Sequence, residues 1–189
     1  ETAWIENGKY VPQCHRDMIE LRARSMGKPY CFLMGVNYHE FDHECVRKYI
    51  LRCIAYGMYP GVSWGYFTKP EKFYERDRDL FKRYMPLCKK VGEAGWRPRC
   101  TLVRTDDANV YAEQFGDRIV TICNSTAKPR TVRLSAKAGS VAAELVKGGE
   151  IRFPNGECEL ELGPDDVLVL EFGGAAAATP NAVRTPFTP

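Results

Sequence analysis

Residues able to do chemistry gather at three places in the first half of this 189-residue chain. Two glutamates flank a tryptophan near its start, and two further groups of polar and aromatic residues follow or end apolar runs. The three groups are Glu1, Trp4 and Glu6; Asn37, His39 and Glu40; and Trp64 and Tyr66. Carboxylates act as general acids, general bases or nucleophiles, and imidazole exchanges protons near neutral pH. The chain thus carries groups for acid–base chemistry together with aromatic and hydrogen-bonding side chains for binding.

The elements that must position these residues alternate between helix and strand. Apolar residues at helical spacing predict three helices, over residues 12–25, 42–56 and 73–91. Continuous apolar runs predict strands over residues 28–37 and 61–67. A strand that is apolar throughout is typical of a parallel sheet covered on both faces. Asp42 is the predicted N-cap of the second helix, because its carboxylate can accept a hydrogen bond from a free backbone N–H of the first turn.

The second half changes to short apolar or alternating segments separated by turn residues. These segments predict strands over residues 100–104, 110–115, 118–124, 130–135, 141–147, 150–153, 158–162 and 166–172. The pair Gly116-Asp117 predicts a two-residue hairpin loop, since one type of such loop begins with glycine. Short strands in such a succession are typical of an antiparallel sandwich or Greek-key domain.

Composition divides the chain near residue 99. Residues 1–99 hold all three Trp, nine of the ten Tyr, and 18 Lys and Arg against 12 Asp and Glu, for a net charge of +6. Residues 100–189 carry a net charge of −3. Residues 173–189 are rich in Ala, Pro and Thr without apolar periodicity, which predicts a disordered tail or linker. The sequence therefore predicts one unit over residues 1–99, an antiparallel unit over residues 100–172, and a tail.

Composition also disfavours several partners and cofactors. The net charge of +3 is too small to predict a nucleic-acid partner, and no apolar run of about 18 residues predicts a membrane span. The eight cysteines form no C-x-x-C pair and do not cluster with the three histidines, so we expect no metal ion and no cofactor. Reduced, core-filling thiols are favoured over four disulfides. Asn124-Ser125-Thr126 fits a glycosylation sequon, which matters only in a secreted eukaryotic protein.

The order of the elements resembles the carboxy-terminal end of a (β/α)8-barrel glycoside hydrolase of the α-amylase and α-galactosidase type. The segments that carry this resemblance over residues 28–172 are 28–34 (KPYCFLM), 56–61 (YGMYPG), 73–80 (FYERDRDL), 110–124, 131–134 and 162–172. These motifs are architectural rather than catalytic. The resemblance implies an α/β plus all-β fold, in which the last βα units of a TIM-type barrel precede a small antiparallel β-sandwich. The strands near residues 30–36 and 62–67 would then be the seventh and eighth of the barrel.

The resemblance also implies where a site would lie, because barrel enzymes place their chemistry on the loops at the carboxy-terminal ends of the strands. The substrate-binding residues that it implies are Trp4, Asn37, His39, Glu40, Trp64 and Tyr66. Aromatic rings would stack on a sugar, and Asn and His would hydrogen-bond its hydroxyl groups. Glu1 and Glu6 are the implied candidates for a catalytic carboxylate, because glycosidases cleave glycosidic bonds with paired carboxylates. The implied partner is a carbohydrate substrate.

Two or three βα units cannot close a barrel, since parallel edges would be left unpaired. We therefore expect a preceding segment or a second chain to complete the barrel, and the lack of an initiating Met agrees with a chain that is processed or cut from something longer. The alternative for the first half is an independent small α/β layer. For the whole chain, the alternative function is a non-catalytic carbohydrate-binding or structural module, which would place ligand contacts on the sandwich.

Simpler interpretations compete for several of these residues. Glu40 is explained equally well as a carboxylate near a helix start, where the helix dipole favours negative charge. His39 and His43 stand four residues apart, but a metal site is disfavoured because no third ligand is evident. Trp96, near the junction of the two halves, is expected to pack between them rather than to bind a ligand. The alternating charges of residues 75–83 predict a solvated helix face.

Overall fold

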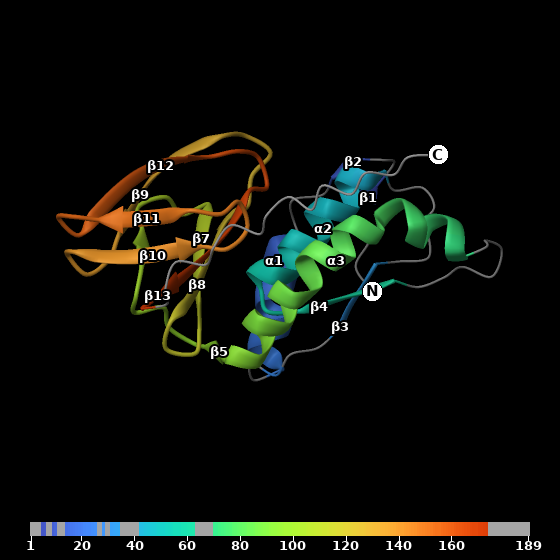
Figure 1. The fold of residues 1–189 in the computed structure, drawn as a ribbon, viewed down its shortest axis with the longest axis horizontal. Helices are drawn as coiled ribbons and strands as arrows, with labels where there is room; N and C mark the ends of the chain where they lie inside the picture. The colour runs from blue at the N-terminus through green and yellow to red at the C-terminus, as the bar shows by residue number, and fades with distance from the viewer. Residues whose placement is uncertain are drawn as a thin grey trace, which may run out of the picture.

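The computed structural model describes residues 5–6, 9–10, 14–25, 28, 31–34, 42–62 and 70–173, and it joins a helical part to an antiparallel part (Figure 1). The three helices are α1 (Cys14–Arg24), α2 (His43–Ala55) and α3 (Pro70–Ala94). Two short strand pairs accompany them. The strands β1 (Ile5–Glu6) and β2 (Lys9–Tyr10) are antiparallel, whereas β3 (Cys31–Met34) and β4 (Tyr59–Val62) are parallel.

The parallel pair depends on how α2 begins and ends. Its predicted N-cap is confirmed, because Asp42 Oδ1 accepts a hydrogen bond from the Cys45 N–H at 2.7 Å. After the helix, Gly57 adopts a positive φ of 65° and turns the chain toward β4. A Cβ atom at this position would lie 2.3 Å from the ring of Phe115, so the close approach also requires glycine.

The predicted strand at residues 61–67 is confirmed in part, since β4 covers Tyr59–Val62 and thus begins two residues earlier, while residues 63–67 lie outside the described residues. β4 contains Pro60, which has no N–H to donate to a sheet. Among the described residues, however, β4 pairs with β3 alone and lies at the edge of that sheet, where proline is tolerated. The other predicted strand of this pair is confirmed in part, as β3 occupies the middle of residues 28–37.

The antiparallel part is a sandwich of two sheets. One sheet has six strands in the order β11-β10-β13-β8-β7-β5, and the other has three in the order β12-β9-β6. Their bounds are β5 Trp96–Arg97, β6 Arg104–Thr105, β7 Val110–Phe115, β8 Ile119–Asn124, β9 Arg130–Ser135, β10 Ser140–Glu144, β11 Glu150–Phe153, β12 Glu157–Leu162 and β13 Val167–Phe172. The apolar side chains between the sheets include Ile122, Leu134, Phe153 and Leu162, all fully buried. The predicted fold class, α/β plus all-β, is therefore confirmed.

Two local predictions in the sandwich are wrong. The strand expected at residues 100–104 overlaps β6, which covers Arg104–Thr105, at Arg104 only. The hairpin between β7 and β8 has a three-residue loop, residues 116–118, because Phe115 pairs with Ile119. Arg118 accepts a hydrogen bond at its carbonyl oxygen from the Phe172 N–H of β13 at 2.9 Å, so it is held by a neighbouring strand and not by the hairpin ladder.

A second apolar core joins the helices to the outer face of the six-stranded sheet. It contains Ile50 and Ile54 of α2 together with Val167 and Val169 of β13. Thr121 Oγ1 on β8 donates a hydrogen bond to the Ala55 carbonyl oxygen at the end of α2, at 2.6 Å. The two parts of the chain are thus packed against each other through α2, β8 and β13.

Ion pairs cross this interface with a consistent polarity. The cations belong to the helices and the carboxylates to the sandwich, in the pairs Arg22–Glu113 (2.9 Å), Lys90–Glu171 (2.6 Å), Arg52–Asp165 (3.6 Å) and Lys48–Asp165 (3.6 Å). Some of the opposite charges of the two halves of the sequence therefore form ion pairs across the interface between them.

Trp96 packs at this junction, as predicted. Its ring lies 4.7 Å from the guanidinium carbon of Arg22, which also lies 5.3 Å from the centre of the Tyr56 ring. Trp96 Nε1 donates a hydrogen bond to Glu113 Oε2 at 2.7 Å, and the same carboxylate oxygen pairs with Arg22. Several elements of the chain therefore meet at one nearly buried guanidinium.

The cysteines that the structure describes in full are free, and three of them are buried: Cys53, Cys88 and Cys123. Burial raises the pKa of the Cys88 thiol to about 12 and that of Cys53 well above its ordinary value. The thiols of Cys53 and Cys88 are therefore protonated at neutral pH, and both pack as small apolar groups.

Candidate functional site

The candidate site is at the carboxy-terminal end of the parallel sheet, where both β3 and β4 end. This end of the sheet is called the edge of the candidate site. The two strands run side by side in register from Cys31–Tyr59 to Met34–Val62. Because they are parallel, both carboxy-terminal ends lie at the same edge. The connection of residues 35–42 leaves this edge for α2, and the connection of residues 63–69 leaves it for α3. The two connections, which are distant in sequence, therefore start next to each other.

The predicted site residues fall on these connections and at the start of the chain. Asn37, His39 and Glu40 belong to the first connection, and Trp64 and Tyr66 belong to the second. These five, together with Glu1 and Trp4, lie outside the described residues. Glu6 is described at its backbone only, where it pairs with Lys9 in the β1–β2 hairpin. The roles assigned to these residues thus stay predictions. The structure defines the strands and helices that the two connections join.

Tyr49 of α2 anchors β4 at this edge. Its hydroxyl donates a hydrogen bond to the Gly61 carbonyl oxygen at 3.0 Å and accepts one from the Gly61 N–H at 2.8 Å. Burial raises the pKa of this phenol far above its ordinary value, so the hydroxyl keeps the proton that it donates. Sequence reasoning placed Tyr49 on the apolar face of a helix but gave no indication of what its hydroxyl would bind.

A polar cluster joins the first turn of α2 to α3. His43 Nδ1 lies 2.9 Å from Asp77 Oδ1, and Arg76 donates to both oxygens of the same carboxylate. The second ring nitrogen, His43 Nε2, lies 3.5 Å from Asp79 Oδ2. Next to this cluster, the hydrogen bond from the Cys45 N–H lowers the pKa of the Asp42 carboxyl, so the cap is ionised at neutral pH.

The prediction of a solvated helix face over residues 75–83 is wrong for Asp77, which is fully buried. A signal for this burial does exist in the sequence. Asp77 lies three residues before Leu80 and seven before Tyr84, at the spacing of one helix face, and both of these side chains are buried. A carboxylate on the apolar face of a helix requires partners, which here are His43 of α2 and the neighbouring Arg76 of α3.

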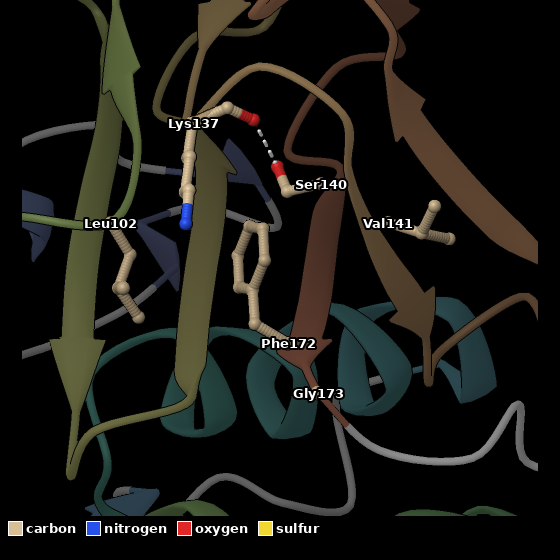
Figure 2. A pocket seen from close by; sticks show the side chains of 6 residues that line it. All are labelled: Leu102, Lys137, Ser140, Val141, Phe172 and Gly173. Carbon is tan, nitrogen blue, oxygen red and sulfur yellow. Dashed lines mark hydrogen bonds between the residues drawn. The ribbon is translucent and has the colours of Figure 1, made fainter.

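A different hollow lies on the sandwich, with a volume of about 380 Å³. It is lined by Leu102, Lys137, Ser140, Val141, Phe172 and Gly173 (Figure 2). The Ser140 hydroxyl donates a hydrogen bond to the Lys137 carbonyl oxygen at 2.6 Å, and the Phe172 ring stacks on Phe153. The lining includes no carboxylate or imidazole, so this hollow offers little acid–base chemistry.

The structure gives the Asn124-Ser125-Thr126 sequon a structural role. The Asn124 side chain is fully buried, and its amide nitrogen donates hydrogen bonds to the carbonyl oxygens of Lys128 and Gly163 at 2.8 Å each. Its amide oxygen accepts from the Thr126 N–H at 3.0 Å. In the folded protein this asparagine fixes a turn and is not accessible as a glycan acceptor.

Two observations concern other kinds of site and are confined to the described part of the chain. No group of three or more His, Cys, Asp or Glu side chains there is arranged to hold a metal ion. None of the described helices is long and apolar enough to cross a membrane.

No family model and no curated protein matches this sequence. Solved structures that it is similar to include an α-amylase from Geobacillus thermoleovorans complexed with acarbose, at 15% identity over 69% of this chain and 33% of that chain, with a TM-score of 0.48. An Anoxybacillus α-amylase matches at 12% identity over 83% of this chain and 40% of that one, with a TM-score of 0.49. α-Galactosidase I from Mortierella vinacea matches at 10% identity over 78% and 40%, with a TM-score of 0.44. The chain thus spans well under half of the length of these proteins, and likeness at this level carries no conclusion about activity.

Proposed function

We propose that this chain is the carboxy-terminal portion of a glycoside hydrolase, with the end of a barrel over residues 1–99 and a sandwich over residues 100–172. The main support for this proposal is the parallel pairing of β3 with β4. Because the two strands are parallel, the connections 35–42 and 63–69 both begin at the same carboxy-terminal end of the sheet. That edge is where barrel enzymes build their sites. The packing of α2 against the sandwich supports the same arrangement, since it gives the edge a rigid base.

Each residue has a chemical role in this proposal. Trp64 and Tyr66 would stack on the apolar face of a sugar ring, and Asn37 and His39 would hydrogen-bond its hydroxyl groups. Trp4 and Glu40 would complete this binding surface. Glu1 or Glu6 would act as one member of a pair of catalytic carboxylates.

The other member of that pair would come from outside this chain. Within the described residues, β3 and β4 form a two-stranded sheet, and each strand has one unpaired edge. A preceding segment or a second chain that adds parallel strands to both edges would close the barrel and supply the missing carboxylate. β4 would then no longer be an edge strand, and Pro60, which has no N–H, would leave one hydrogen bond of its ladder unmade.

Binding is the first test. The chain is titrated with oligosaccharides of α-linked glucose and of α-linked galactose, as the wild type and as the variants Trp64→Ala, His39→Ala and Phe172→Ala. We expect the first two variants to weaken binding at least about tenfold, because they remove stacking and hydrogen bonding. The Phe172 variant, in the hollow of the sandwich, should bind like the wild type. Binding that depends on Phe172 and not on Trp64 would instead assign the chain as a carbohydrate-binding module and overturn the proposal.

Catalysis is tested in the protein with a completed barrel. Glu1→Gln and Glu6→Gln each preserve the size of the side chain and remove its charge. A catalytic carboxylate should lose several orders of magnitude in kcat when changed in this way, with the thermal unfolding unaltered. Unchanged turnover in both variants would remove both residues from the catalytic role.

A further inference from the structure

Glu144, the last residue of β10, has a buried carboxylate that accepts four hydrogen bonds from the backbone. Its Oε1 atom accepts from the Val146 N–H at 2.9 Å and from the Val169 N–H at 3.2 Å. Its Oε2 atom accepts from the Lys147 N–H at 2.6 Å and from the Gly148 N–H at 3.1 Å. Each oxygen of this carboxylate is therefore bound by two backbone donors.

The arrangement of these donors is specific for an anion. A carboxylate can only accept hydrogen bonds, and its two oxygens offer about four acceptor positions, which matches the four N–H groups around it. Three of the donors are successive N–H groups in the connection between β10 and β11. Successive N–H groups that converge on one point form a concave site for an anion. Gly148 allows this shape, because its φ of 91° is one that other residues rarely adopt.

The same connection is attached to the helical part of the chain. The Val146 side chain is buried in the core that joins the helices to the six-stranded sheet. The Val146 carbonyl oxygen accepts a hydrogen bond from Arg83 Nη2 of α3 at 3.0 Å. The Lys147 ammonium group pairs with Asp166, directly before β13. The residues whose N–H groups bind Glu144 thus contact α3 and the start of β13 through their other groups.

We propose that this connection forms a backbone anion site for a small carboxylate, which the Glu144 side chain fills in the wild type. The backbone anion site consists of the N–H groups of Val146, Lys147, Gly148 and Val169. When the site is filled, the connection keeps the shape that presents the Val146 carbonyl oxygen to Arg83. Glu144 therefore acts on α3 through the connection, although its own carboxylate does not reach that helix.

The test removes the side-chain carboxylate and supplies a free one. Glu144→Ala is prepared in the full chain and titrated with sodium formate at constant ionic strength, with formamide as a neutral molecule of similar shape. Without formate, we expect a lower Tm than in the wild type and amide hydrogen exchange at least about tenfold faster in the backbone anion site. Formate should restore both, because a ligand that binds only the folded state stabilises it, whereas formamide should restore neither.

The matched control is Glu150→Ala, at the other end of the same connection. The Glu150 carboxylate pairs with Arg152 at the surface and accepts no hydrogen bond from the backbone anion site. This variant, like the wild type, should keep its amide exchange and its Tm when formate is added.

The action on α3 is tested with Arg83→Met, which removes the donor to the Val146 carbonyl oxygen and keeps an apolar side chain. The fall in Tm that this change causes should be smaller in the Glu144→Ala background than in the wild type, and formate should restore it. Equal falls in both backgrounds would overturn the link between the backbone anion site and α3.

Two results with a folded Glu144→Ala variant would overturn the site itself: amide exchange as in the wild type, or an equal response to formate and formamide. If this variant does not fold even with formate, Glu144→Gln decides the question. Its amide has one oxygen, so protection should survive in only one donor pair, either Val146 with Val169 or Lys147 with Gly148. Protection of all four N–H groups in Glu144→Gln would overturn the requirement for an anion.

Discussion

Removing the charge of Glu113 should lower the free energy of unfolding more than breaking an exposed ion pair would, because Glu113 lies at the junction of the two halves. The side chains of Arg22 and Glu113 are 3% and 17% exposed, and the guanidinium is in contact with the Trp96 and Tyr56 rings. Breaking a buried ion pair by changing one partner costs roughly 3–5 kcal/mol. In Glu113→Gln the new amide oxygen can still accept from Trp96 Nε1, and Glu113 keeps some access to water in the wild type. We therefore expect this variant to cost about 2 kcal/mol.

Urea and thermal unfolding measure this cost, followed by tryptophan fluorescence and by far-ultraviolet circular dichroism. For a chain of this size, about 2 kcal/mol corresponds to a fall in Tm of about 4–8 °C. The control is Arg97→Met, which breaks the exposed pair with Asp117 beside the same hairpin and should leave the Tm unchanged.

The double variant Arg22→Met/Glu113→Gln separates the pair from its surroundings. Since it removes both charges together, its cost should be smaller than the sum of the two single costs by about 1–2 kcal/mol. Additive costs, or a Glu113→Gln variant within about 0.5 kcal/mol of the wild type, would refute the reasoning.

Three further changes test the fold around the candidate site. Gly57→Ala should lower the free energy of unfolding by more than Gly95→Ala, since both have positive φ but only Gly57 is in close contact with a neighbouring ring, and urea titration of the two variants decides the order. Tyr49→Phe should cost about 1–3 kcal/mol and speed exchange of the Gly61 amide, because that N–H and its carbonyl both lose a buried partner. Asp42→Ala should cost about 1 kcal/mol at pH 7. Because the pKa of the folded cap is lowered, its contribution to stability is present above the unfolded pKa and disappears as pH falls through the folded value. The variant and the wild type should therefore converge in stability on the acid side of the unfolded pKa, and a difference that stays constant as the cap is protonated would contradict the assignment.

Elements with a periodic apolar face could be predicted from the sequence, although α3 is three residues longer at each end than the predicted helix 73–91. The apolar spacing and the Asp42 cap located α2 to within one residue, and several strands of the sandwich lie where turn residues bound an apolar run. These signals are local, since each depends on neighbours in the chain. The position of β4 was harder to predict, because whether a sheet accepts Pro60 depends on which of its edges is paired.

The candidate site was predictable only as two groups of residues that follow strands. Nothing local to Tyr49 indicates that its hydroxyl binds the backbone of Gly61, and nothing local to His43 indicates Asp77. Such contacts depend on how α2 packs against α3 and β4. The spacing of apolar residues predicts the elements themselves but not how they pack. The burial of Asp77 could nevertheless have been inferred from its place on the apolar face of α3.

The six-stranded sheet has a consequence for how this chain can be divided or recombined. Every residue of β8 is buried, because one face of the sheet covers the three-stranded sheet while the other covers α2. The sheet is therefore a middle layer shared by both halves, and cutting the chain near residue 99 would expose an apolar face ringed by carboxylates that had lost their cations. A sandwich of this kind is not an interchangeable module. Transferring it to another protein would require recipient helices that carry the matching cations, and a glycine after the last turn of the helix that takes the place of α2.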